Sequence, residues 1–269
     1  MRIPLLTQSS SNRRGSAAYP GRQEEISLTE TRTLIAAAGR GSRAALPYPK
    51  TLFLVQGKPI LLRICGVLRP YDPRPTIIVS PSGERPIREC LEKAGLTAHF
   101  VRQPEPKGMG EAVLRFAESP AFTAAKHVLL IWGDVPFVQP ETVTAVVEAH
   151  YSRGNDFTFV SRVVSSPYTI VLRNDMGEVT GVLETREAGL TPPAEGERDI
   201  GVFIFRKEPV FDALREDLSG KWGCHTGEQG FLYVIGHLVR GGCKVEGLPI
   251  AKEIETVSLN SVRELAGYA

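Results

Sequence analysis

Short apolar runs punctuate the chain, and each one ends at a glycine, a serine or another turn residue. Continuous apolar runs of this length are typical of strands that are buried on both faces of a parallel sheet. The pattern predicts three such strands, at residues 33–38, 76–79 and 127–132.

Between the apolar runs, the hydrophobic positions follow a helical period. An i, i+3, i+4, i+7 stripe predicts an amphipathic helix with one buried face, formed here by Ile87, Cys90, Leu91 and Ala94. A second helix is expected to begin at Gly110, and a third to span Pro140 to about Ser152 with proline in its first turn. Alternating strands and helices indicate βαβ crossovers.

The second half of the chain has a different pattern of apolar runs and turn residues. Further strands are expected near residues 156–164, 168–172, 179–183 and 201–205. Turn residues between them favour antiparallel strands added to the parallel core. Residues 191–198, rich in Pro, Gly and Glu, are interpreted as an exposed loop. The predicted fold class is α/β, with a Rossmann-like, mixed but mostly parallel sheet and helices on both faces.

Residues 1–32 have no hydrophobic period and are biased toward serine and arginine. A transit peptide has such a composition, but we favour a flexible N-terminal extension. Residues 33–269 are then expected to form one catalytic domain.

Composition narrows the functional classes. A net charge of +2 and a pI near 8.3 give no electrostatic case for binding nucleic acid. No apolar run approaches the roughly 20 residues that cross a bilayer, so no membrane association is expected. The four scattered cysteines match neither a zinc site nor a paired framework, which favours reduced thiols in a cytoplasmic protein.

The most specific motif follows the first predicted strand. It reads Ala37-Ala38-Gly39-Arg40-Gly41-Ser42-Arg43, with Lys50 seven residues further on. Glycines let consecutive backbone N–H groups converge on an anion, and Arg43 and Lys50 add positive charge. The motif is neither the dinucleotide fingerprint nor the Walker A loop, which argues against a dinucleotide-binding oxidoreductase. It predicts a phosphate site of another kind.

A carboxylate follows the central apolar strand, at Asp134 in Trp132-Gly133-Asp134. Ligands bind open α/β sheets at the carboxyl ends of their strands. Mg²⁺ accompanies triphosphates and keeps several waters, so one or two protein oxygens are enough to hold it. Asp134 is therefore the first candidate for a Mg²⁺ ligand, although a turn aspartate before Pro136 is the alternative.

With these motifs the chain resembles the sugar-1-phosphate nucleotidyltransferases, most closely the N-acetylglucosamine-1-phosphate uridylyltransferase branch, from about Leu34 to about Ala266. The resemblance implies a fold of the nucleotide-diphospho-sugar transferase type. It also implies catalytic roles for Arg43 and Lys50. The implied nucleotide-binding residues are Ala37, Ala38, Gly39, Gly41, Ser42, Gln103, Gly108 and Met109, with Gln103 hydrogen-bonding the uracil edge and Gly108 letting the base lie close.

The resemblance also implies a metal site and an acceptor site. Asn260 is the implied second metal ligand beside Asp134, although it also suits a helix N-cap. The implied sugar contacts are Thr169, Glu184 and Asp199. Thr169 and Asp199 stand where the family usually has glycine and asparagine, so the acceptor side departs from the family pattern. Residues 227–235 resemble a family helix.

The expected reaction joins a nucleoside triphosphate, UTP first, to a sugar 1-phosphate such as N-acetylglucosamine 1-phosphate, with Mg²⁺ as cofactor and pyrophosphate as leaving group. Two alternatives stay open: the same fold acting on a non-sugar phosphate, and a non-catalytic relative that binds nucleotide or sugar nucleotide. The chain ends soon after Leu265, so we expect one activity without an acyltransferase domain. The acceptor and the oligomeric state are left open.

Overall fold

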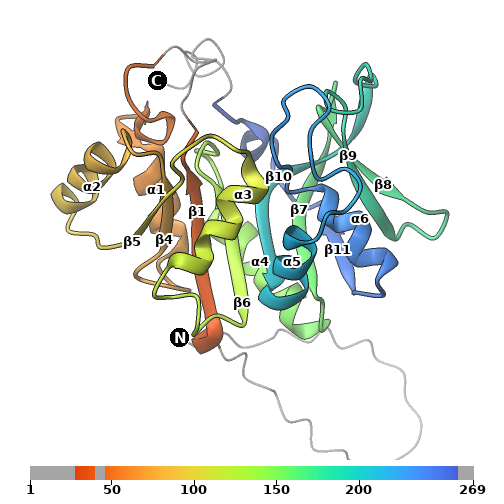
Figure 1. The fold of residues 1–269 in the computed structure, drawn as a ribbon, viewed down its shortest axis with the longest axis horizontal. Coiled ribbons are helices and arrows are strands. Elements are labelled where there is room, and N and C mark those ends of the chain that lie inside the picture. Colours follow the sequence, from red (N-terminus) through yellow and green to blue (C-terminus); the bar gives the residue numbers. More distant parts are fainter. Residues whose placement is uncertain (1–27, 40–45, 260–269) are drawn as a thin grey trace, which may run out of the picture.

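A computed structural model describes residues 28–39 and 46–259 of the 269-residue chain. Its centre is a seven-stranded sheet with the order β11-β7-β10-β6-β1-β4-β5 (Figure 1). The strand bounds are β1 Thr31–Ala37, β4 Thr76–Val79, β5 His99–Arg102, β6 His127–Trp132, β7 Phe157–Ser165, β10 Glu195–Arg206 and β11 Val245–Leu248.

The sheet is mostly parallel. Strands β5, β4, β1 and β6 run in one direction, while β10 pairs antiparallel with both β6 and β7. Strand β11 completes the sheet as a parallel partner of β7. Two small hairpins lie outside the main sheet, and their strands are β2 Leu54–Val55, β3 Lys58–Pro59, β8 Thr169–Arg173 and β9 Val179–Glu184.

Helices cover both faces of the sheet. Three helices pack into the apolar cluster on one face, and they are α1 Ile60–Leu68, α2 Glu84–Lys93 and α4 Pro140–Ser152. Three others pack into the cluster on the opposite face, and they are α3 Met109–Leu114, α5 Lys207–Arg215 and α6 Tyr233–Arg240. Short 3₁₀ turns span Leu28–Glu30, Lys50–Leu52, Arg115–Glu118 and Glu253–Thr256.

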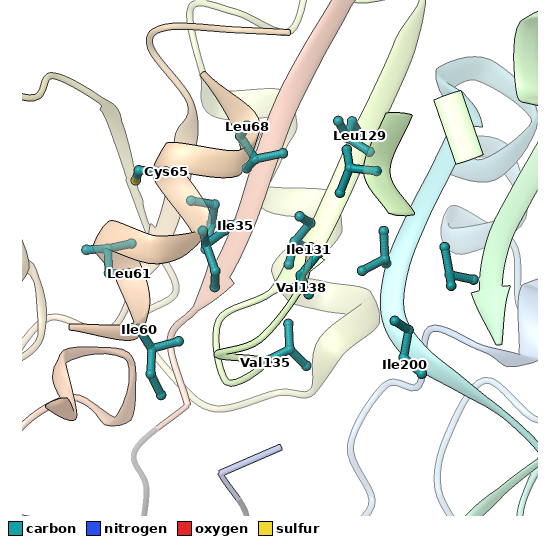
Figure 2. Close-up of a cluster of buried hydrophobic side chains, with 14 of the residues drawn as sticks. Ile35, Ile60, Leu61, Cys65, Leu68, Leu129, Ile131, Val135, Val138 and Ile200 are labelled. Carbon is teal, nitrogen blue, oxygen red and sulfur yellow. The ribbon is translucent and has the colours of Figure 1, made fainter. Parts of the chain in front are cut away.

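The continuous apolar runs of the sequence follow from this layering. Neighbouring residues of a strand point to opposite faces, so Leu34 and Ile35 enter different clusters and both are fully buried. Figure 2 shows α1 lying over β1, with Ile60 and Leu68 beside Ile35. Strands β1 and β6 are buried along most of their length, because both faces of the sheet are covered.

The structure confirms the predicted fold class and the strands at 76–79 and 127–132. The third predicted helix is α4, with the expected bounds. Strand β1 begins two residues before Thr33 and ends at Ala37. The strands expected near residues 168–172 and 179–183 form β8 and β9, which pair with each other outside the main sheet.

Two expectations were wrong. Residues 191–198 are not all loop, because β10 begins at Glu195 and pairs with β7 from there. The polar side chains of this segment have partners in neighbouring strands: the Glu197 carboxylate accepts hydrogen bonds from Ser161 and Arg173. The polar composition of this segment suggested an exposed loop, but its charged side chains are paired with residues of neighbouring strands.

Residues 227–235 are also not one helix, because α6 begins only at Tyr233. The preceding residues are extended and irregular, and Gln229 forms an antiparallel bridge with Trp222. The backbone of Gln229 also pairs with Lys107 and Gly110, which holds this segment away from helical geometry. In residues 28–39 and 46–259, no helix has both the length and the apolar character that a bilayer crossing requires.

Candidate active site

The carboxyl ends of β1 and β6 lie side by side because the two strands pair in parallel, with Ala36 opposite Trp132. The backbone N–H of Gly133 donates to the Ala36 carbonyl at 2.9 Å. A Cβ atom at Gly133 would lie 2.6 Å from that oxygen, so only glycine fits there. This close approach puts the next residue, Asp134, beside the end of the Ala37-Ala38-Gly39 segment.

Lys50 and Asp134 meet at this edge of the sheet. Lys50 Nζ donates to Asp134 Oδ2 at 2.8 Å, with about a fifth of each side chain exposed. Lys50 opens the 3₁₀ turn Lys50–Leu52, which returns the chain to the strand ends after the glycine motif. The structure therefore brings together two predicted site residues that lie 84 positions apart in the sequence.

Asp134 is also the predicted Mg²⁺ ligand. In this structure the Lys50 ammonium already supplies a positive charge to the Asp134 carboxylate. The backbone N–H of Leu259 donates to the Asp134 carbonyl at 2.9 Å, so the C-terminal segment reaches this edge one residue before Asn260. The described residues contain no cluster of three or more His, Cys, Asp or Glu side chains suited to a metal. Mg²⁺ needs only one or two protein oxygens.

Four predicted site residues lie outside the described ranges: Gly41, Ser42, Arg43 and Asn260. Their roles in binding phosphate, catalysis and metal binding stay predictions. The described part of the glycine motif consists of Ala37 and Ala38, which are buried, and Gly39, which is exposed.

The predicted nucleobase segment follows β5. Gln103 is buried, and its backbone N–H continues the parallel pairing by donating to the Val79 carbonyl. Its side-chain Nε2 donates to the Gly108 carbonyl at 2.9 Å and to Glu111 Oε2 at 2.6 Å. Two acceptors on one side fix the orientation of the amide. No described residue donates to the carbonyl oxygen, Oε1, which is therefore the group available to a ligand.

Gly108 and Gly110 attach this segment to the Gln229-Gly230 segment. Gly108 has a φ of 100°, and a Cβ atom there would lie 2.3 Å from the Gln229 carbonyl oxygen. At Gly110 a Cβ atom would lie 2.0 Å from the Gly230 carbonyl oxygen. In the described structure the Gln229 backbone thus explains why residue 108 is glycine, whereas contact with a base stays a prediction.

A cavity of about 610 Å³ opens beyond Trp132, between the β8–β9 hairpin, β10 and the segment before α6. All three predicted acceptor residues line it: Thr169, Glu184 and Asp199. Met109, predicted to bind nucleotide, lies in the wall as well. Thr169 and Glu184 are direct cross-strand partners in the hairpin, which explains how residues 15 positions apart face one space.

Asp199 is buried at the irregular step of β10. Its Oδ1 accepts a hydrogen bond from Thr169 Oγ1 at 2.7 Å, and its Oδ2 accepts one from the Gly201 backbone N–H at 3.1 Å. Gly201 has a φ of 79°, and a Cβ atom there would lie 2.4 Å from the Trp132 ring. The Trp132 ring thus requires glycine at this bend, and the bend turns Asp199 toward Thr169.

Glu184 has an unusual electrostatic setting. Burial, together with the charges of Asp199 and Glu187, raises its pKa to about 7. Burial also raises the pKa of Asp199, although the hydrogen bond from Thr169 opposes that shift. Carboxyl groups with raised pKa values are a frequent mark of functional sites. Near neutral pH, Glu184 is divided between its charged and neutral forms.

Sequence reasoning did not identify several residues of the site. Glu111 holds the Gln103 amide, and Trp132 and Trp222 line the cavity. The position of Trp132, directly before Gly133-Asp134, was an available signal. Nothing in the sequence pattern pointed to Trp222, because its place in the wall depends on the bridge to Gln229.

Comparison with known proteins places the chain in a family. The model of the MobA-like NTP transferase domain matches residues 33–216, and the chain belongs to this family of nucleotidyltransferases. The match spans the glycine motif, Asp134 and the β8–β9 hairpin, and it agrees with the resemblance to sugar-1-phosphate nucleotidyltransferases.

Among curated relatives, the bifunctional protein GlmU of Streptococcus agalactiae serotype V is 27% identical over 235 residues, which cover 87% of this chain and 50% of the relative. GlmU of Neisseria gonorrhoeae is 26% identical over 236 residues, with 87% and 49% covered. The chain thus spans about half the length of the curated relatives it matches.

Solved structures share the fold. The nucleoside-diphosphate-sugar pyrophosphorylase of Vibrio cholerae RC9 aligns with a TM-score of 0.66 and 17% identity, over 88% of this chain and 98% of that one. A Bacillus anthracis protein assigned as a glucose-1-phosphate thymidylyltransferase aligns with a TM-score of 0.68 and 17% identity, over 88% and 95%. At this identity the similarity concerns the fold.

Proposed function

We propose that this chain is a Mg²⁺-dependent pyrophosphorylase that joins UTP to a phosphorylated acceptor, with sugar 1-phosphates such as N-acetylglucosamine 1-phosphate as the first candidates. The observation that carries the proposal is the Lys50–Asp134 pair at the ends of β1 and β6, beside the cavity that begins at Trp132. A cation and a metal-binding carboxylate at one strand edge suit a triphosphate, and the adjacent cavity suits its acceptor.

In the proposed reaction, an oxygen of the acceptor phosphate attacks the α-phosphorus of the triphosphate. The new P–O bond forms as the bond to the β-phosphate oxygen breaks, and pyrophosphate leaves with that electron pair. The acceptor is already an anion, so no general base is needed, and catalysis comes from positioning and charge stabilisation.

Each charged residue has a part in that step. Lys50 would neutralise the α-phosphate and hold the acceptor phosphate near it, and Arg43 would steady the leaving pyrophosphate. Mg²⁺ held by Asp134 and Asn260 would screen the charge of the triphosphate oxygens. The hydrogen bond to Asp134 holds the Lys50 ammonium at the strand edge.

The hydrogen bonds of Gln103 support uracil as the base. Its Nε2 is engaged by Gly108 and Glu111, which leaves Oε1 as an acceptor. Uracil presents an N3–H donor to such an oxygen, whereas N3 of cytosine is itself an acceptor and would be left unpaired. An unpaired buried polar group costs about 1–3 kcal/mol, so UTP should be used roughly tenfold better than CTP.

The test is pyrophosphate release by the purified protein with Mg²⁺, each nucleoside triphosphate and a panel of sugar 1-phosphates, with the nucleotide product identified by mass. We expect release with UTP in preference to CTP. No release with any triphosphate and any phosphorylated acceptor would reject a catalytic role and leave the non-catalytic nucleotide-binding alternative. A cytoplasmic location stays a prediction.

A further inference from the structure

The acceptor cavity is acidic, which is unexpected for a site that must admit a phosphate. Four carboxylate side chains and one basic side chain are among its described lining residues: Glu184, Glu187, Asp199, Glu228 and Arg186. A phosphorylated acceptor carries negative charge of its own. Lys50 can compensate the charge of the phosphate. The rest of the acceptor, however, lies in a cavity whose walls carry the same negative sign as the phosphate.

We propose that the acceptor carries a protonated amine or ammonium group in addition to its phosphate, held between Glu184, Asp199 and the aromatic walls of the cavity. This inference rests on the proposed function and names the chemical class of its acceptor. It favours an amine-bearing phosphate over the acylated sugar phosphate that heads the panel above.

The hydrogen bonds of the two carboxylates support a cation over a hydroxyl group. Asp199 accepts from Thr169 and Gly201, which are both neutral donors. The neighbouring Arg198 guanidinium lies over the Tyr168 ring, 4.5 Å from its centroid, and donates to the Thr256 carbonyl. Asp199 is thus a buried carboxyl group whose described hydrogen-bond donors are all uncharged.

Glu184 has even fewer partners. No described residue donates a hydrogen bond to its carboxylate, which lies in the cavity wall across the hairpin from Thr169. A ligand hydroxyl would provide one hydrogen bond but leave the partly desolvated charge uncompensated. A protonated amine provides both the hydrogen bond and the opposite charge. Burial and the like charges of Asp199 and Glu187 raise the pKa of Glu184, so a positive charge beside it would stabilise its ionised form.

Aromatic side chains complete the site. Trp132, Tyr168, Trp222 and Tyr233 all line the cavity. Trp132 is held in the floor by ring contacts with Phe203 and Phe231, whereas Trp222 is 53% exposed. The face of an aromatic ring attracts a cation, and an ammonium group among rings and carboxylates gains from both. The cavity volume of about 610 Å³ suits a ligand the size of a sugar phosphate.

Tryptophan fluorescence provides an intrinsic probe for binding at this site. The chain has only two tryptophans, Trp132 and Trp222, and both line the cavity. Intrinsic fluorescence therefore reports on ligands there without nucleotide and without turnover. At pH 7 with Mg²⁺ present, glucosamine 1-phosphate would be titrated against glucose 1-phosphate and N-acetylglucosamine 1-phosphate, which share the ring but lack the free amine. Phosphoethanolamine against glycerol 3-phosphate distinguishes an alcohol phosphate from an amino-sugar phosphate.

We expect at least one amine-bearing phosphate to bind at least tenfold more tightly than the matched phosphate that lacks a free amine. In Glu184→Gln that preference should fall to threefold or less, whereas Glu92→Gln, an exposed charge-matched change on α2, should retain it. Equal affinity within each pair in the wild-type protein would overturn the inference, and so would a preference unchanged in Glu184→Gln. The wild-type comparison stands even if the variant folds poorly.

Pyrophosphate release separates this inference from the function on which it rests. Turnover of neutral sugar phosphates without any fluorescence preference for amines would overturn the inference and retain the nucleotidyltransferase. An amine preference in binding, without turnover of any acceptor, would support the cation site and reject the proposed reaction.

Discussion

The proposed site has two sides, a nucleotide side and an acceptor side, and they are built in different ways. On the nucleotide side, parallel strands end together, and the edge brings one cation, Lys50, against one carboxylate, Asp134. On the acceptor side, a hairpin and the bend of β10 bring Glu184 and Asp199 to one cavity with no basic partner among their described hydrogen bonds. The first side contains an ion pair, whereas the described residues form no ion pair with Glu184 or Asp199.

This difference suggests that the two sides of the site select their ligands by different features. A prepaired cation and carboxylate suit a ligand that brings both phosphate and Mg²⁺, since each partner can be exchanged for one part of the ligand. An unpaired carboxyl group instead selects for what it lacks. The Lys50–Asp134 edge is thus expected to accept any triphosphate with Mg²⁺, whereas Gln103 selects the base and the acceptor side selects the second substrate.

The largest expected effect comes from removing the cation of the nucleotide side. Lys50→Ala should lower kcat for pyrophosphate release by about 10²–10³-fold, about 3–4 kcal/mol, because the developing phosphoryl charge loses its counterion. Stability should change by less than about 1 kcal/mol, since the Lys50–Asp134 pair is partly exposed. Steady-state kinetics and urea unfolding measure the two quantities.

The matched control is Lys93→Ala, which removes an exposed lysine at the end of α2. It should leave both kinetics and stability unchanged. A Lys50→Ala protein with wild-type kcat would show that the strand edge is not the site of phosphoryl transfer and would remove the basis of the comparison.

The next effect concerns the junction of the two sides. Gly110→Ala puts a Cβ atom 2.0 Å from the Gly230 carbonyl oxygen, so α3 and the cavity wall must separate. We expect a loss of about 2–3 kcal/mol in the free energy of unfolding, with a shift in the emission of nearby Trp222. Gly66→Ala in α1 meets no atom within 4 Å and should be neutral or stabilising by about 0.5–1 kcal/mol. Equal stability of the two variants would show that α3 and residue 230 are not tightly packed.

Sequence alone predicted the nucleotide side better than the acceptor side, and the reason is physical. Buried parallel strands produce apolar runs whose ends are visible in the sequence, so the sequence alone predicts that Asp134 lies at a strand end. Lys50 was expected near the same phosphates, although its direct pairing with Asp134 is a tertiary contact that no local pattern encodes.

The acceptor side depends on contacts between distant segments. The charges of Glu195 and Glu197 suggest a loop at the start of β10, yet Glu197 pairs with Arg173 at the end of β8. The helix expected from residue 227 begins at Tyr233 because Gln229 is bound to Lys107. The family resemblance implied that Thr169, Glu184 and Asp199 belong to one site, but nothing in the sequence indicated that the cavity around them is acidic and aromatic.

The smallest effect, and the one that addresses the unpaired side most directly, is the pH dependence of stability at Glu184. Its pKa is raised from an ordinary 4.5 to about 7 in the folded protein, mainly by burial and next by Asp199. Between these values the folded state binds more protons than the unfolded state, so this group reduces stability as pH rises through 7. Glu184→Gln does not titrate and should avoid that loss.

We therefore expect Glu184→Gln to match the wild type in urea unfolding near pH 4.5 and to exceed it by about 1–2 kcal/mol at pH 8. Each unit of pKa shift corresponds to about 1.4 kcal/mol, and partial exposure of the side chain reduces the sum. Glu92→Gln should show the same difference from wild type at both pH values, because that carboxylate is exposed on α2. A Glu184→Gln advantage that is equally large at pH 4.5 would come from packing of the amide and not from titration. An advantage that is absent at pH 8 would mean that Glu184 already has a partner in the folded protein. The cavity would then resemble the nucleotide side, with its charge satisfied before the acceptor arrives.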